Sequence, residues 1–174
     1  MVSVFNRALA YTLEREGGYR YTETPDDAGK GTFAGLTAKT VASFYGRTLT
    51  ASQMKAMTPT EVAAIYKTMY WDAIQGEKIP SPIIAMCLFD MAVLMGPVRA
   101  AMLAQSVVSQ KTDGAIGPKT LAALTTVGTV AFVNAFSDLC DAFFAQIVAN
   151  NPTQQKFLAG WQKRTSLMDH IAHV

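Results

Sequence analysis

Residues 14–37 read E-R-E-G-G-Y-R-Y-T-E-T-P-D-D-A-G-K-G-T-F-A-G-L-T, and this stretch decides how the chain before and after it folds. In the preceding residues 4–13, apolar side chains recur at steps of three and four, which predicts one face of an amphipathic helix. Glu16 continues this face, and Gly17 and Gly18 end the helix. The sequence therefore places a carboxyl group where a helix face meets a glycine-rich loop.

A carboxyl group in this position is a candidate general acid. Partial burial and the negative end of a helix dipole both favour the protonated form of a carboxyl group, which can then donate to a leaving oxygen. The alternative for Glu16 is a solvated residue at a helix end. Asp26 and Asp27 follow in a turn-rich segment, and a loop could carry one of them back to face Glu16 across a cleft. Glycoside hydrolysis by two carboxylates needs such a pair, whereas an aspartate that caps a turn does not imply one.

Several motifs together carry a resemblance to a known family. The strongest are E-G-G-Y at 16–19, D-A-G-K-G-T-F-A-G-L-T at 27–37 and the pair Tyr70-Trp71. On these motifs the sequence resembles the N-acetylmuramidases of glycoside hydrolase family 108, which occur as phage endolysins and related bacterial cell-wall hydrolases. Lys30 stands where the family has a second glycine, and the loop before Asp27 is longer than usual. Weaker similarity extends over nearly the whole chain, in the segments 81–101, 113–120 and 157–164.

The resemblance implies a peptidoglycan hydrolase that cleaves the β-1,4 bond between N-acetylmuramic acid and N-acetylglucosamine. It implies that Glu16 is the acid and that Asp27, or alternatively Asp26, positions the water or stabilises the developing positive charge. Thr32 or Thr37 would hold the water through its hydroxyl group. The expected substrate-binding residues are Tyr19, Phe33, Thr37, Tyr70 and Trp71. Aromatic residues at helical spacing also fill cores, which is the alternative for Tyr70 and Trp71.

Two other functions are alternatives at this point. A lytic transglycosylase would share the acid and the substrate but would form 1,6-anhydromuramic products, and a non-catalytic protein would bind peptidoglycan without cleaving it. We expect no cofactor and peptidoglycan as the partner of a monomer. We expect no nucleic-acid partner, because no basic stripe with interleaved aromatic residues occurs in the sequence.

The composition predicts one compact domain, since 174 residues with 50% hydrophobic and 16% charged side chains can bury a sizeable core. Helix signals dominate, and only residues 32–37 favour a strand or hairpin. The expected helices are 38–45, 58–71, 81–95, 98–109, 117–124, 129–150 and 153–170. The fold class is mainly α, and the resemblance implies a lysozyme-like helical domain with a small β-hairpin beside the active-site cleft.

The motif I-P-S-P at 79–82 is the nearest thing to a linker. Within a single domain 1–174, we expect a catalytic lobe at 1–78 and a helical lobe at 79–174 that resembles the family's peptidoglycan-binding region. The uncharged stretch 121–137 contains glycine, asparagine and threonine, so we expect a buried helix and no stable membrane insertion.

Cys87 and Cys140 lie among apolar residues, which predicts reduced core thiols. No metal site is expected, since His170 and His173 have no further ligands at suitable spacing.

The charge and the chain start bear on location. Lys156, Lys163 and Arg164 make the C-terminal region basic, and the net charge of +2 favours anionic cell envelopes. The sequence lacks a secretory signal, which predicts synthesis in the bacterial cytoplasm. Action on peptidoglycan in the periplasm or cell wall would then need a separate holin-type pore, which the resemblance to phage endolysins implies.

Overall fold

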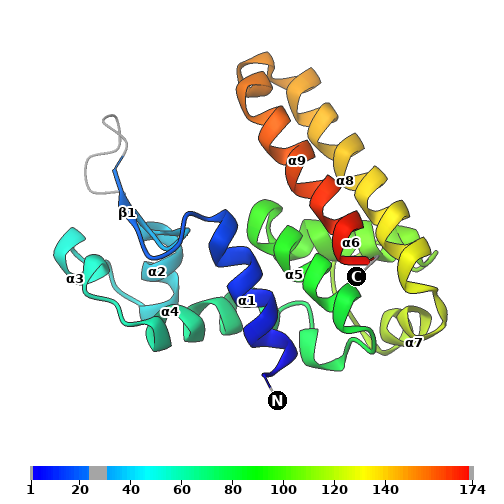
Figure 1. Ribbon diagram of the computed structural model, residues 1–174, viewed down its shortest axis with the longest axis horizontal. Coiled ribbons are helices and arrows are strands. Elements are labelled where there is room, and N and C mark those ends of the chain that lie inside the picture. The colour runs from blue at the N-terminus through cyan, green and yellow to red at the C-terminus, as the bar shows by residue number, and fades with distance from the viewer. Residues whose placement is uncertain (1, 24–30, 173–174) are drawn as a thin grey trace. The chain divides into compact units, whose positions relative to one another are not determined.

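A computed structural model describes residues 2–23 and 31–172 of the chain, with side chains described as far as Met168. The chain divides into two compact units, Met1–Ala73 and Ile74–Val174. In Figure 1 the first unit runs from blue to blue-green and the second from green to red.

The first unit combines short helices with a small sheet (Figure 1). Its elements in chain order are α1 (Val4–Arg15), β1 (Tyr21–Thr22), β2 (Thr32–Phe33), β3 (Leu36–Thr37), α2 (Ala38–Tyr45), α3 (Ala51–Lys55), α4 (Pro59–Tyr66) and the π-helical turn η1 (Lys67–Trp71).

The described residues of the second unit form helices joined by loops, with no strand among them. Its elements are the 3₁₀ turn η2 (Gly76–Lys78), α5 (Pro82–Met95), α6 (Pro97–Val107), α7 (Pro118–Thr126), α8 (Thr129–Asn150), the 3₁₀ turn η3 (Pro152–Gln154) and α9 (Gln155–Ala172). Helices α8 and α9 lie side by side as a long hairpin closed by η3 (Figure 1). Helix α5 contacts α6, α8 and α9, and so forms the centre of this unit.

Helix α1 begins and ends as the sequence predicts. The Ser3 side chain accepts a hydrogen bond from the Asn6 N–H and caps the first turn. The buried face carries the predicted apolar spacing, with Phe5, Ala8, Leu9, Thr12 and Leu13. At the other end, Gly17 (φ 85°) and Gly18 (φ 69°) adopt left-handed conformations that favour glycine and terminate the helix.

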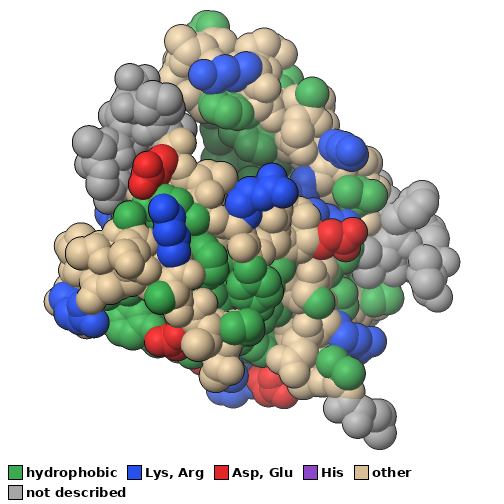
Figure 2. All heavy atoms as spheres, turned by 60° about the vertical axis from the view of Figure 1, so that its left-hand side comes forward, with side chains coloured by type: hydrophobic (Ala, Val, Ile, Leu, Met, Phe, Trp, Pro, Cys, Tyr) green, Lys and Arg blue, Asp and Glu red, His purple; other side chains and the backbone are tan. Residues whose placement is uncertain are grey.

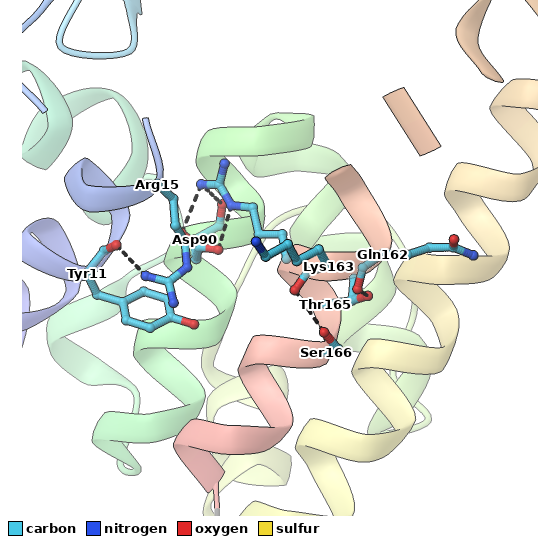
Figure 3. Close-up of polar contacts among 8 residues, drawn as sticks. Tyr11, Arg15, Asp90, Gln162, Lys163, Thr165 and Ser166 are labelled. Carbon is cyan, nitrogen blue, oxygen red and sulfur yellow. Dashed lines mark hydrogen bonds and ion pairs between the residues drawn. The ribbon is translucent and has the colours of Figure 1, made fainter. Parts of the chain in front are cut away.

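The last turn of α1 is reinforced by a side chain. Arg15 donates from Nη1 to the carbonyl of Tyr11 at 2.7 Å, as Figure 3 shows, and its guanidinium carbon lies 3.2 Å from the centre of the Tyr11 ring. A cation that bonds a carbonyl near a helix C-terminus stabilises that end. Glu16 follows on this anchored turn.

The predicted hairpin at 32–37 is confirmed as β2 and β3, and β1 joins it to form a three-stranded antiparallel sheet. The register pairs Thr22 with Thr32 and Thr32 with Thr37. Strand β1, at Tyr21–Thr22, was not predicted, because two residues are too few to show an alternating pattern.

The capping signals locate α4 correctly but not its end. Thr58 and Glu61 form a capping box, with Pro59 at the first helical position between them. The predicted helix through residue 71 is wrong in one respect, because α4 ends at Tyr66 and the next five residues wind as a π-helix. Helix α3 was missed, although Thr50 and Gln53 form a capping box there.

The stretch 121–137, expected to form a buried helix, is divided between the end of α7 and the start of α8, so that expectation is wrong in its bounds. Helix α8 is the longer of the two helices. By length and composition it could cross a membrane, and 33% of its most apolar window is buried. It packs on α5, α6 and α9 through a face that includes Phe132, Phe136 and Phe144, so packing within the unit accounts for this face of the helix. Cys140 on α8 and Cys87 on α5 are both buried and neither forms a disulfide, as predicted.

A buried ion pair joins α5 to α9. Arg164 donates from Nε to Asp90 Oδ2 at 2.8 Å and from Nη2 to Oδ1 at 2.9 Å, drawn as dashed lines to Asp90 in Figure 3. The Asp90 side chain is fully buried and that of Arg164 is 10% exposed. The prediction that Arg164 adds to a basic exterior is therefore wrong, because its charge is neutralised inside the unit. On the face in Figure 2, the exposed lysine and arginine side chains are scattered among apolar and polar ones.

Candidate active site

The site is built around Glu16 at the end of α1. Its N–H donates to the Thr12 carbonyl at 3.0 Å, and the Gly18 N–H donates to the Leu13 carbonyl at 2.8 Å. These bonds fix the backbone of the last helical turn, and the Glu16 side chain is half-buried. The carboxyl group therefore extends from a fixed backbone position at the helix end and is partly accessible to solvent.

The turn between β2 and β3 lies against the stem of Glu16. A Cβ added to Gly35 would lie 2.7 Å from both Cβ and Cγ of Glu16 and 2.6 Å from the Tyr66 hydroxyl, so only glycine fits without displacement of these side chains. Ala34 (φ 49°) and Gly35 (φ 75°) both have positive φ, as a two-residue type I′ hairpin turn requires. Gly35 is thus needed for the turn and for the approach to the carboxyl side chain.

Helix α4 holds this turn in place. The buried Tyr66 hydroxyl donates to the Ala34 carbonyl at 2.8 Å. The ring of Tyr70 lies 5.6 Å from that of Tyr66, which places a second phenol beside the first. Tyr70 belongs to the π-helical turn, a local distortion that is frequent at functional sites.

The electrostatics of Tyr70 connect it to the candidate acid. Burial is the main cause that raises the pKa of the Tyr70 hydroxyl above its usual value of 10.0, and the negative charge of Glu16 raises it further. A hydrogen bond with Thr40 acts in the opposite direction. Glu16, Tyr70 and Thr40 therefore form one polar cluster, in which a protonated phenol lies near the carboxyl group.

Three threonines form a row across one face of the sheet, because residues paired directly across antiparallel strands point to the same side. They are Thr22, Thr32 and Thr37. The Thr37 hydroxyl caps α2 by accepting from the Thr40 N–H at 3.2 Å, so it already has a structural role. Among the described residues, the hydroxyl of the half-buried Thr32 forms no hydrogen bond.

The aromatic candidates differ in their access to a ligand. Tyr19 is 49% exposed, and its ring lies 6.4 Å from the ring of the buried Phe33, which supports it from below. Trp71 is completely buried, and its ring lies 5.6 Å from that of Phe5. Trp71 therefore packs in the core. Of the three residues, Tyr19 and the half-buried Tyr70 have rings that a ligand can reach.

Asp26 and Asp27 lie outside the described residues, on the connection between β1 and β2. Within residues 2–23 and 31–168, no group of three or more His, Cys, Asp or Glu side chains could hold a metal ion. The side chains of His170 and His173 lie beyond that range.

Sequence reasoning missed Thr40 and Ala34 as parts of the site. Thr40 follows Thr37 by three residues, the spacing of a capped first turn, which could have drawn attention to it. Ala34 has no such signal, since alanine seldom adopts positive φ and only the following glycine indicates the turn.

The chain is similar to two described protein families and to a solved structure. Residues 9–96 match the family described as "Glycosyl hydrolase 108", and residues 99–166 match one described as "Predicted Peptidoglycan domain". Among solved structures, that of Brucella abortus SagA is similar over 97% of this chain and 92% of its own, with 33% sequence identity and a TM-score of 0.81. The comparison with curated proteins gives no match.

Proposed function

The chain belongs to the glycosyl hydrolase 108 family, and from this membership we propose that it is a muramidase. The bond cleaved is the β-1,4 bond between N-acetylmuramic acid and N-acetylglucosamine in peptidoglycan. The match of residues 99–166 to a peptidoglycan domain supports this polymer as the substrate. The protein acts at the cell wall.

The observation that carries the proposal is the position of Glu16 against the Gly35 turn and near Tyr70. Glu16 donates its proton to the glycosidic oxygen as the bond breaks, which is the role of the general acid in two-carboxylate glycosidases. The packed stem of the Glu16 side chain reduces its conformational freedom, so the carboxyl group is already ordered before the substrate binds.

Asp27 is the second carboxylate of the proposal, and Asp26 is the alternative. Either residue would follow β1 and precede β2, whose first residue is Thr32. The carboxylate positions or activates the water, or stabilises the oxocarbenium-like charge of the transition state. Thr32 holds the water, since Thr37 already uses its hydroxyl to cap α2.

The exposed ring of Tyr19 provides a stacking surface for a sugar, and Phe33 fixes its position. Tyr70 contributes its hydroxyl at the acid. Trp71 acts on the site through the packing that holds the π-helical turn. The biological role that we propose is lysis of a bacterial host cell, with a separate pore-forming partner that gives access to the wall.

The decisive experiment compares the wild type with Glu16→Gln on purified peptidoglycan, with release of reducing sugar ends as the readout. We expect the rate to fall by about a hundredfold to ten-thousandfold, because the amide cannot donate a comparable proton. Glu14→Gln, an exposed change two positions away on the same helix, is the matched control and should leave the rate unchanged. Equal rates for the wild type and Glu16→Gln would refute the assignment.

Two further measurements separate the alternatives. Mass spectrometry of the released muropeptides should show reducing muramic acid ends, whereas 1,6-anhydro ends would identify a transglycosylase. Asp27→Asn should lower the rate strongly and Asp26→Asn weakly; the reverse order would make Asp26 the catalytic partner.

A further inference from the structure

A pocket outside the proposed active site opens in the second unit where α5 ends and α6 begins. It has a volume of about 480 Å³, within the range of small-molecule sites. Its side chains are apolar apart from one, and they are Met95, Pro97, Val98, Met102, Phe143 and the charged Arg99. A pocket with one cation in an apolar wall suits a ligand that is both anionic and partly apolar.

Arg99 is held in position without being neutralised. Its guanidinium carbon lies over the Phe143 ring, 4.9 Å from the ring centre. Among the residues that the structure describes, Arg99 forms no ion pair and no hydrogen bond. Arg99 is exposed, so its N–H donors are available to an acceptor from solution, and a carboxylate can accept two of them.

The apolar rim beside Arg99 is also fixed. Val98 is 60% exposed, and the backbone of Gly114 lies so close to it that a Cβ added to Gly114 would be 2.6 Å from Val98 Cγ1. The buried Gln105 holds this loop by accepting from the Gly114 N–H at 2.9 Å and donating to Asp113 and to the Ala115 carbonyl. An exposed valine kept in place by a braced loop is an apolar contact ready for a ligand.

We propose that this pocket binds the peptide stem of peptidoglycan, with Arg99 pairing a stem carboxylate. The proposal rests on the proposed function, which supplies the polymer, and on the match of residues 99–166 to a peptidoglycan domain. In peptidoglycan the glycan strand is largely neutral, because the muramic carboxyl group is amide-linked to the stem. The free carboxylates and the alanine methyl groups belong to the peptide, and they complement Arg99 and the apolar rim respectively.

The dipole of α6 also favours an anionic ligand, because the pocket lies at the first turn of this helix. Arg99 nevertheless provides the selectivity for a carboxylate. Arginine can engage a planar carboxylate through two parallel hydrogen bonds, which lysine cannot reproduce. The pocket therefore distinguishes the anionic stem from the neutral glycan.

The test uses the full chain with Glu16→Gln, so that no cleavage occurs, and calorimetric titration with a soluble stem tetrapeptide of alanine, glutamate and diaminopimelate. Adding Arg99→Gln should weaken binding at least about tenfold, and Arg99→Lys should weaken it less. Lys156→Met is the matched control, because Lys156 also lies over a ring, that of Phe157, but outside the pocket. It should change the affinity less than about twofold.

Two additional ligands make the outcome specific. A tetrapeptide with amidated carboxylates, and oligomers of N-acetylglucosamine, which carry no carboxylate, should show no dependence of binding on Arg99. Equal affinity of the tetrapeptide for the Arg99 and Lys156 variants, or no tetrapeptide binding at all, would overturn the proposal. Release of reducing ends by the wild type is measured separately, so failure of the stem site and failure of the muramidase function are distinguishable.

Discussion

Tyr66 donates its hydroxyl hydrogen to the carbonyl of Ala34 across 2.8 Å, and this bond ties α4 to the turn that lies against Glu16. Tyr66 and Ala34 are both fully buried, so the bond is shielded from water. The position of the proposed acid thus depends on a hydrogen bond between segments 32 residues apart in the chain.

Removal of this bond tests that dependence. Tyr66→Phe leaves the buried Ala34 carbonyl without its partner, which should lower the free energy of unfolding by about 1–3 kcal/mol. Hydrolysis of peptidoglycan should slow as well, because the turn beside Glu16 loses its anchor. Urea unfolding and the reducing-end assay measure the two effects. Tyr45→Phe removes a longer, exposed bond to Glu61 and should cost less than about 0.5 kcal/mol.

Gly35→Ala tests the close approach of the turn to Glu16. The new methyl group would meet Glu16 and Tyr66 and would also require positive φ, so we expect a loss of about 3 kcal/mol and a marked fall in activity. Gly46→Ala provides the control, because Gly46 has φ 67° but no atom within 4 Å of the added Cβ. Gly46→Ala should lower the free energy of unfolding by about 1–2 kcal/mol, which is the cost of placing alanine at a positive φ. Similar losses for both variants in thermal unfolding would contradict the close packing at Gly35.

Tyr70 should make stability depend on alkaline pH. Because burial raises its pKa in the folded state above 10.0, the folded protein holds the phenol proton more tightly than the unfolded chain does. The associated stability is fully present below pH 10.0 and is lost as the pH rises through the folded pKa. Tyr70→Phe should therefore lose less of its unfolding free energy than the wild type as the pH rises above 10.0. Parallel pH curves for the two proteins in urea unfolding would be the contrary result.

The buried pair of Asp90 and Arg164 should dominate the stability of the second unit. Asp90→Asn leaves a largely buried guanidinium without its counter-charge, which should cost roughly 3–5 kcal/mol. Lys67 and Asp72 form a matched pair at the surface, with side chains 48% and 51% exposed, and Asp72→Asn should cost at most about 1 kcal/mol. Equilibrium unfolding in urea compares the two; a small effect at Asp90 would show that solvent reaches the pair.

Local signals predicted much of this fold. Thr58, Pro59 and Glu61 define the start of α4 by their own spacing, and the apolar face of α1 is the one observed in the core. These features depend on residues within one or two turns of one another, which a sequence displays directly. The class, mainly helical with a small sheet, follows from them.

The features that could not be predicted from the sequence depend on contacts between distant residues or on the local winding of the backbone. Arg164 looked like part of a basic region because its partner, Asp90, lies 74 residues away. The π-helical turn has no compositional signal, so a continuous helix was the natural expectation for residues 67–71. At the site, Glu16 followed from the sequence pattern, but the Tyr66 anchor and the role of Thr40 needed the tertiary arrangement. The choice between Asp26 and Asp27 stays a prediction.

The π-helical turn has an evolutionary consequence. Its i to i+5 bond from the Asp72 N–H to the Lys67 carbonyl, at 2.8 Å, accommodates one residue more than an α-helical turn would. Because the wider turn takes up this extra residue, deleting one residue there would restore α-helical winding and leave the later side chains pointing in nearly the same direction relative to α4. An insertion into a regular α-helical turn, by contrast, would rotate the later side chains by about 100°. Among relatives, this turn should therefore occur either at its present length or as an α-helical turn that is one residue shorter.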